Sequence, residues 1–156
     1  MGMAKEIERK FLVADDGWRA SVERSSSIRQ FYLAAAKDRS VRVRIRDGVA
    51  CLTLKFGTQA RVRDEFEYPI PLAEAEEMQA FAIGSVIDKT RHDVRFGGHV
   101  YEVDVFAGAL SGLILVELET PEEVADVELP GWLGREITGE AAYYNASLAL
   151  QGRPER

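Results

Sequence analysis

Charged side chains at every second position are the feature that most constrains how this chain can fold. Glu6, Glu8 and Lys10 are each separated by a single residue, within a stretch rich in Ile, Phe, Leu and Val. In a β-strand, alternate side chains share one face. These three charges therefore line one face of a predicted strand, and most of the apolar residues line the other.

The same alternation recurs along most of the chain, and turn residues separate its repeats. Asp47-Gly48 and Gly97-Gly98 are two-residue hairpin signals, because glycine tolerates a positive φ. We predict a serine loop over 25–27 and strands over residues 4–13, 28–33, 40–46, 49–56, 61–70, 85–96, 99–106 and 113–120. Apolar spacing and capping residues predict helices over 18–22, 72–82 and 138–150, with another that starts at 121.

The polar face of these strands carries both signs of charge. Its acids are Glu6, Glu8, Glu65, Glu67, Glu102, Asp104, Glu117 and Glu119. Its bases are Lys10, Arg42, Arg44, Arg46, Lys55, Arg63, Lys89 and Arg91. A solvated face with cross-strand ion pairs explains any one of these strands by itself. Recurrence over so many strands, with three arginines at alternate positions of one of them, favours a shared enclosed surface.

Closure of the sheet would bring these charges together. The helices are too few to cover a wide flat sheet, whereas about eight antiparallel strands can close and leave room for one small ligand. We therefore predict an α+β, β-dominated fold: a closed eight-stranded antiparallel β-barrel, or tunnel, with a charged lumen and a few flanking helices. Such a lumen is costly unless it holds water, metal ions and a charged ligand. Arg and Lys suit a polyanion, and paired Glu suit Mg²⁺ or Mn²⁺.

Composition bounds the remaining choices. At 156 residues, 46% of them hydrophobic, the chain is expected to form a single domain over 1–156. A formal net charge of −6 argues against nucleic acid or an acidic membrane as a partner. Cys51 is the single cysteine, the N-terminal segment is too charged for a signal peptide, and no apolar run is long enough to span a membrane. We expect a cytoplasmic protein, and its outward apolar faces are compatible with a homodimer.

An ordered set of short motifs resembles the CYTH superfamily, also called triphosphate tunnel metalloenzymes. Residues 6–10 look like its ExExK signature, and residues 143–145 with the last predicted helix look like its C-terminus. Ala141 and Ala142 depart from the pattern, since relatives often carry a basic residue in that stretch. Between the two ends, the matching motifs occur in order: Arg42-Val43-Arg44, Leu52-Thr53-Leu54-Lys55, Glu65-Phe66-Glu67, Lys89-Thr90-Arg91, Glu102-Val103-Asp104-Val105-Phe106 and Glu117-Leu118-Glu119.

The resemblance implies a divalent-metal-dependent triphosphatase, similar to short bacterial inorganic triphosphatases, that hydrolyses tripolyphosphate to pyrophosphate and phosphate with Mg²⁺ or Mn²⁺. The implied metal ligands are Glu6, Glu8, Glu117 and Glu119. The implied substrate-binding residues are Lys10, Arg42, Arg44, Lys55, Lys89 and Arg91. Catalysis is expected to depend most on Glu6, Glu8, Lys10, Lys89 and Arg91. Tyr32 either contacts the substrate, closes one tunnel end or packs in the core.

Several other functions are compatible with these residues. The same tunnel could cyclise ATP, or hydrolyse thiamine triphosphate or a nucleoside triphosphate. A non-catalytic domain that senses or stores polyphosphate would bind it without turnover, and a structural β-protein with a wet charged sheet would bind nothing. Four further acids could ligate metal, orient the basic side chains or balance charge: Glu65, Glu67, Glu102 and Asp104.

Overall fold

One antiparallel sheet contains all nine strands of the part of the chain that the structure describes. The structure is a computed structural model, and it describes residues 7–59 and 62–154. The strands are β1 (Ile7–Val13), β2 (Val22–Ala36), β3 (Arg39–Arg46), β4 (Val49–Gln59), β5 (Val62–Ile70), β6 (Ile83–Phe96), β7 (His99–Ala107), β8 (Ile114–Thr120) and β9 (Leu133–Glu136). The α-helices described are α1 (Leu72–Met78) and α2 (Asn145–Gln151). The short 3-10 helices described are η1 (Gly17–Ser21), η2 (Gln79–Phe81), η3 (Gly108–Leu110), η4 (Asp126–Glu128) and η5 (Ala141–Tyr143).

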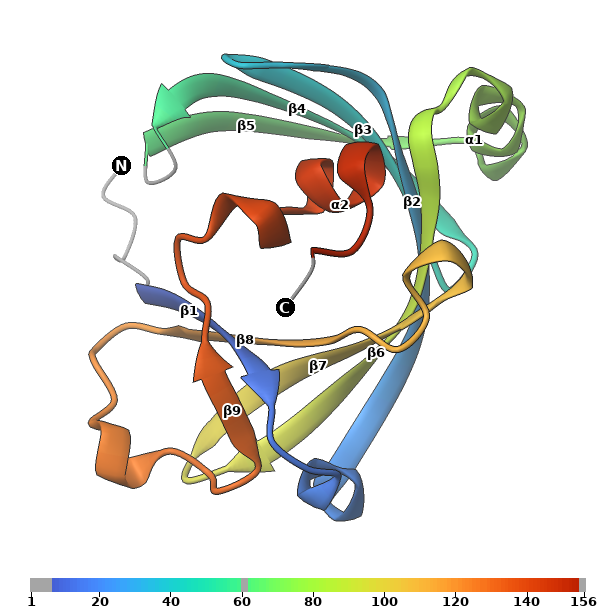
Figure 1. Cartoon of the computed structure of the whole chain (residues 1–156). Helices are drawn as coiled ribbons and strands as arrows, with labels where there is room; N and C mark the ends of the chain where they lie inside the picture. Colours follow the sequence, from blue (N-terminus) through green and yellow to red (C-terminus); the bar gives the residue numbers. More distant parts are fainter. Residues whose placement is uncertain (1–6, 60–61, 155–156) are drawn as a thin grey trace.

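The sheet is strongly curved, but it is open. Its strand order is β5-β4-β3-β2-β6-β7-β8-β1-β9, so β5 and β9 are the edges, and no pairing joins them within the described residues. In Figure 1 the sheet curls into an open C, with β3, β4 and β5 on one arm and β8, β1 and β9 on the other. The fold therefore differs from the predicted closed eight-stranded barrel both in strand number and in closure.

Strand β9 explains why β1 does not close the sheet by pairing with β5. One side of β1 pairs with β8, and on its other side Phe11 lies opposite Glu136 of β9. The amide of Ile137 also donates a hydrogen bond of 2.8 Å to the carbonyl oxygen of Lys10. Since a strand has only two edges, this part of β1 cannot also pair with β5.

Local sequence explains most of the turns and helix ends. Asp47 and Gly48 have φ values of 49° and 81°, which are the left-handed conformations of the predicted hairpin turn. Helix α2 ends at Gln151, and Gly152, which follows it, has a φ of 80°. Helix α1 and η2 together cover the helix predicted over 72–82. No helix in the described chain combines the length and the apolar character needed to cross a bilayer.

Four segments differ from the predictions. The helix predicted over 138–150 is only the turn η5 followed by α2, which begins at Asn145. The loop predicted over 25–27 belongs to β2, where Ser26 is buried opposite Arg91 of β6. The helix predicted from 121 is only the turn η4, because Arg9 donates to the carbonyl oxygen of Val124 at 3.0 Å and pairs with Asp126 at 3.1 Å. These contacts hold the segment as a loop against β1. Strand β9 was not predicted, since four residues are too few for alternation to be recognised.

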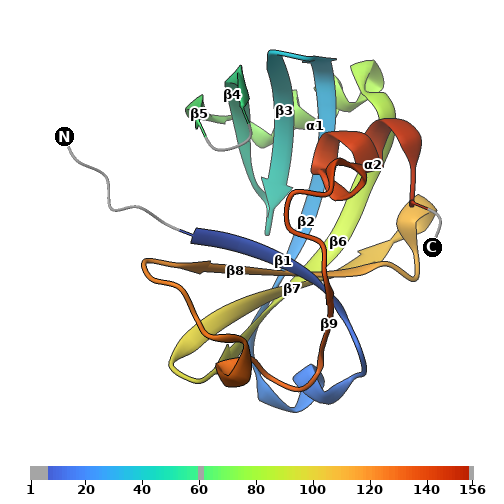
Figure 2. The same ribbon diagram turned by 60° about the vertical axis from the view of Figure 1, so that its left-hand side comes forward.

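Apolar clusters cover the outer face of the sheet and one end of its inner face. Trp18 of η1 and Trp132 cover the outer side of β1, β6, β7 and β8. Ala75 of α1 packs over the outer side of β2, β3 and β4. On the inner side, Leu148 of α2 belongs to a cluster with Tyr32 of β2. Helix α2 therefore lies inside the curve of the sheet, as Figures 1 and 2 both show, and fills one end of it.

Candidate functional site

The charged positions of neighbouring strands lie side by side on the inner face of the sheet. Glu67 of β5 lies opposite Thr53 of β4, which lies opposite Arg42 of β3. On the other arm, Glu117 of β8 lies opposite Lys10 of β1. The alternation in the sequence thus becomes one polar band that crosses the sheet from β5 to β1.

A buried ion-pair cluster occupies the middle of this band. Asp104 Oδ2 lies 2.8 Å from Lys89 Nζ, and Arg91 donates to both Asp104 oxygens from Nε and Nη2 at 2.8 and 2.9 Å. All three side chains are buried. Burial acts to raise the pKa of Asp104, but the two adjacent cations outweigh it and keep this pKa below its ordinary value. Asp104 therefore stays a carboxylate and holds both cationic groups in place.

Arg42 and Arg44 form a second cationic group, on β3. Neither forms an ion pair with an acidic residue that the structure describes, and the Nε of Arg44 donates to the neutral Oε1 of Gln30 at 3.1 Å. Burial is the main cause that lowers the pKa of Arg44 to about 10, and repulsion from Arg42 and Arg91 contributes less. The arm formed by β2, β3 and β4 thus carries uncompensated positive charge that a bound anion would stabilise.

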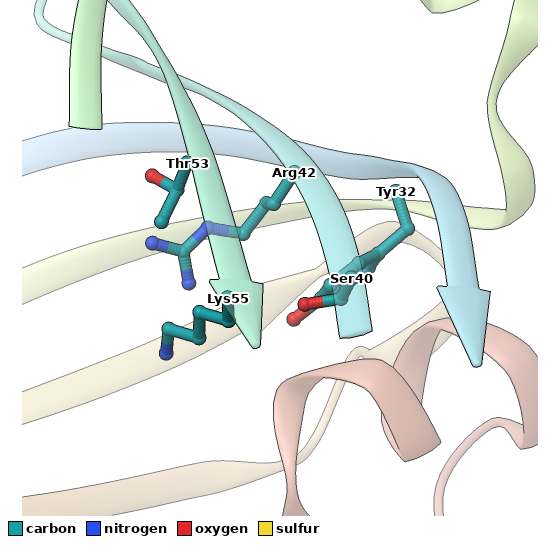
Figure 3. Close-up of a pocket in the computed structure, with 5 residues that line it drawn as sticks. All are labelled: Tyr32, Ser40, Arg42, Thr53 and Lys55. Atoms are coloured by element: carbon teal, nitrogen blue, oxygen red, sulfur yellow. The ribbon is translucent and has the colours of Figure 1, made fainter. Parts of the chain in front are cut away.

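A narrow pocket opens beside Arg42. Its lining residues are Tyr32, Ser40, Arg42, Thr53 and Lys55. In Figure 3 the guanidinium of Arg42 and the ammonium of Lys55 extend to the same side of their strands, with Thr53 beside them. Tyr32 borders this pocket and also belongs to the buried cluster around α2. Tyr32 therefore packs in the core at the border of this pocket, and its contact with a substrate stays a prediction.

Three carboxylates meet on the other arm. One oxygen each of Glu8, Glu117 and Glu119 lies within 4.8 Å of the other two. Glu8 and Glu119 are direct partners in the β1–β8 ladder, where like charges repel one another unless a cation compensates them. Lys10 Nζ lies 3.7 Å from Glu117 and supplies one positive charge. Carboxylate oxygens are the ligands that Mg²⁺ and Mn²⁺ prefer, so this group fits a divalent cation.

The remaining acids of the inner face lie at different depths. Glu65 and Glu67 are exposed on the edge strand β5, with Glu65 opposite Lys55. Glu102 is half-buried, and its Oε2 lies 3.5 Å from Arg91 Nη1. Burial raises the pKa of Glu102, and Arg91 offsets this only in part. Glu102 thus joins the buried ion-pair cluster, whereas the two acids of β5 stay at the open edge.

The structure places most of the described residues of the predicted site on a single face, in three groups: the buried ion-pair cluster, the cationic group of β3 and the acidic group of β1 and β8. Glu6, a predicted ligand, lies outside the described residues. Gln30 and Thr53 also lie on this face, opposite Arg44 and Arg42. Alternation predicts that they share a face with Tyr32 and Lys55, but they were not predicted as site residues because they are neutral.

Sequence comparison connects this geometry with known proteins. The CYTH domain model matches residues 4–151. The inorganic triphosphatase of Acetivibrio thermocellus is 41% identical over 147 residues, which cover 94% of each chain. The inorganic triphosphatase of Nitrosomonas europaea is 36% identical over 151 residues, which cover 93% of this chain and 97% of that one.

Solved structures share the same fold. The crystal structure of the inorganic triphosphatase NE1496 matches with a TM-score of 0.74 at 35% identity, covering 97% of this chain and 99% of that one. A conserved hypothetical protein from Pyrococcus furiosus, at 19% identity and a TM-score of 0.56 over 80% of this chain and 82% of its own, is similar in fold alone. The family model and both relatives extend over nearly the whole chain. The chain therefore belongs to the CYTH domain family.

Proposed function

We propose that this chain is a divalent-metal-dependent triphosphatase that hydrolyses inorganic tripolyphosphate to pyrophosphate and phosphate. The observation that carries the proposal is the uncompensated cationic group of Arg42 and Arg44 on the same inner face as the three carboxylates around Glu117. A tripolyphosphate chain with bound metal supplies the matching charges for both groups. Two relatives that are similar over most of their length are named inorganic triphosphatases.

The cations would position the phosphate chain and stabilise the charge that moves to the leaving group. Phosphoryl transfer passes through a loose transition state, so fixed positive groups around the oxygens account for much of the rate enhancement. Asp104 keeps Lys89 and Arg91 in position before the substrate arrives. The residues proposed to bind phosphoryl oxygens are Lys10, Arg42, Arg44, Lys55, Lys89 and Arg91.

The acidic group would hold the metal. Glu8, Glu117 and Glu119 are the proposed ligands of Mg²⁺ or Mn²⁺, with Glu6 as a further one. When bound there, the cation supplies Lewis-acid polarisation of phosphoryl oxygens. Lys10 lies 3.7 Å from Glu117, so its ammonium group would reach from the acidic group toward the substrate.

Phosphate release from tripolyphosphate tests the proposal. We expect one phosphate and one pyrophosphate per tripolyphosphate with Mg²⁺ or Mn²⁺, and none with excess EDTA. Arg44→Ala should lower kcat/KM by at least about tenfold, because a charged hydrogen-bond donor to the substrate is lost. Arg29→Ala is the control, since Arg29 pairs with Asp88 at 2.8 Å on the outer face. Turnover that persists in EDTA, or equal activity of the two variants, would contradict the proposal.

A second candidate substrate is an organic triphosphate, which a pocket next to Arg44 favours. This pocket has a volume of about 410 Å³, and its lining residues are Arg44, Arg46, Val49, Ala50, Cys51, Glu67 and Pro69. The apolar part of its lining would accept an organic group attached to the end of the phosphate chain. The same assay with ATP and thiamine triphosphate decides the matter: a kcat/KM at least about tenfold above that for tripolyphosphate would reverse the assignment.

A further inference from the structure

Gln30 is a fully buried amide in the middle of the cationic arm. It lies on β2 opposite Arg44 of β3 and Ile87 of β6, and its exposed fraction is 0%. An apolar side chain of similar length, such as Met, would fill this space without the cost of burying an amide. The amide therefore calls for an explanation other than packing.

The contact with Arg44 sets the orientation of the amide. Arg44 Nε donates to Gln30 Oε1 at 3.1 Å. A guanidinium group has donors and no acceptor, so the oxygen of the amide must face it and the nitrogen must face away. This nitrogen, Gln30 Nε2, is buried and has no hydrogen-bond partner among the residues that the structure describes.

Two neighbouring side chains are in the same situation. Arg42 Nε and Thr53 Oγ1 are buried, and each is also without a hydrogen-bond partner in the described chain. Arg42 and Thr53 are opposite one another in the β3–β4 ladder, one inner-face position along from the pair formed by Gln30 and Arg44. Buried polar atoms are nearly always paired in folded proteins. Three unpaired atoms on adjacent strands point to a ligand that completes their hydrogen bonds.

We propose that Gln30 is a substrate-binding residue: its Nε2 donates to a phosphoryl oxygen of the polyanion while its Oε1 holds Arg44 in position. The identity of the polyanion rests on the proposed function, but this role does not depend on hydrolysis. A neutral donor suits the place, because a further cation beside Arg42 and Arg44 would increase their mutual repulsion. An amide adds a hydrogen bond to the anion without that penalty.

Calorimetric binding in EDTA, where no turnover is expected, tests this role. The ligands are phosphate, pyrophosphate, tripolyphosphate and ATP, and the proteins are the wild type, Gln30→Met, Arg44→Ala and the double variant. We expect Gln30→Met to raise the Kd for tripolyphosphate about tenfold, or ~1.4 kcal/mol. We expect a further loss of several-fold when Gln30→Met is added to Arg44→Ala, because the amide contacts the ligand itself.

Two more variants separate binding from folding. Thr120→Val removes a buried hydroxyl that donates to the carbonyl oxygen of Glu122. Thr120 follows Glu119 on β8, and its side chain is on the opposite, outer face, so this variant should change the melting temperature but not the Kd for the anion in EDTA. Gln30→Glu keeps an acceptor for Arg44 and so preserves the fold. It replaces the free donor by a carboxylate oxygen, and should weaken tripolyphosphate binding more than Gln30→Met does.

The outcomes distinguish this role from the proposed function. Wild-type affinity in Gln30→Met would overturn the role of Gln30, as would a loss that disappears in the Arg44→Ala background. If Gln30→Met does not fold, wild-type affinity in Gln30→Glu would overturn it instead. Binding of tripolyphosphate that depends on Gln30, without metal-dependent hydrolysis, would refute only the triphosphatase. A wild-type protein that binds none of the four anions in EDTA would overturn the role of Gln30, whereas the triphosphatase is decided by phosphate release with Mg²⁺ or Mn²⁺.

Discussion

Asp104 is the residue on which the cationic cluster depends most. It is buried between Lys89 and Arg91, at 2.8 Å from each. Its replacement by Asn would leave two buried cations without their carboxylate. We expect Asp104→Asn to lower the free energy of unfolding by about 3–5 kcal/mol, as broken buried pairs do. Urea unfolding measures this change.

Asp88→Asn is the matched control for that variant. Asp88 pairs with Arg29 at the same distance of 2.8 Å, but both side chains are half-exposed, so its loss should cost less than about 1 kcal/mol. Equal destabilisation by the two variants would contradict the account of the buried cluster.

The Asp104 carboxylate also makes stability depend on pH. Its pKa is lower in the folded protein than its ordinary value of 3.8, so the unfolded chain binds more protons in that range. The stabilisation is therefore fully present above pH 4 to 5 and is lost as the pH falls below 3.8 toward the folded pKa. The difference between wild type and Asp104→Asn should narrow over that acidic window. A difference that stays constant from neutral pH into acid would argue against this linkage.

A substitution at Glu8 tests most directly whether the acidic group binds a metal ion. Its carboxylate is one of three that meet within 4.8 Å. Removal of one anionic ligand lowers affinity for a hard cation, so Glu8→Gln should weaken Mn²⁺ binding on the order of tenfold or more. Titration followed by the Mn²⁺ electron paramagnetic resonance signal measures the affinity. Glu23→Gln, whose carboxylate pairs with Arg95 instead, should bind Mn²⁺ as the wild type does.

Helix α2 depends on a close backbone approach at the start of strand β6. Gly84 has a φ of +68°, and a Cβ atom there would collide with the backbone carbonyl of Ala149. Gly84→Ala should therefore displace α2 from the inner face and lower the free energy of unfolding by about 2–4 kcal/mol, from backbone strain and overpacking together. Hydrogen exchange of the α2 amides measures the displacement, and denaturant unfolding measures the loss.

Gly98→Ala separates these two contributions. Gly98 has a φ of +81°, but a Cβ atom there would have nothing within 4 Å. This variant should lose only about 1 kcal/mol and leave the exchange of α2 unchanged. If the two variants cost the same, the packing of α2 against Gly84 is not what holds the helix.

Strands could be predicted wherever alternation was long enough to be recognised. The period of two predicted that Arg42 and Arg44 share the polar face of one strand and that Lys55 lies on the polar face of the next. The β3–β4 ladder then places Arg42 opposite Thr53, two residues before Lys55. Strand β9 could not be predicted in this way, because its four residues show no periodic pattern. The loop predicted over 25–27 was wrong. Adjacent serines are typical of a turn, but Ser26 is buried in β2 opposite Arg91.

At the scale of the whole molecule, the sequence predicted a shared charged face, but its prediction of a closed sheet was wrong. The sheet could close only if the free edge of β1 paired with β5. In the structure β9 pairs with that edge, and this pairing could not be predicted from the sequence. The ion pairs between these charges could not be predicted from the sequence either. Alternation showed that Asp104 shares a face with other acids, whereas its contacts with Lys89 and Arg91 follow from register between β6 and β7.

The molecule as a whole also separates its charges. The net charge is −6, yet one arm of the inner face carries cations that lack acidic partners among the described residues. The net negative charge would therefore repel a polyanion from the surface in general, while the cations of the inner face would attract it to the proposed site, which favours selective binding over general adsorption.

A crystal structure with Mn²⁺ and the non-hydrolysable imidotriphosphate would test the central claim most directly. The anomalous signal of Mn²⁺ locates the metal independently of the phosphate chain. The account predicts a peak between Glu8, Glu117 and Glu119, with the phosphate chain extending toward Arg42 and Arg44. Metal and anion bound anywhere other than on this inner face would contradict it.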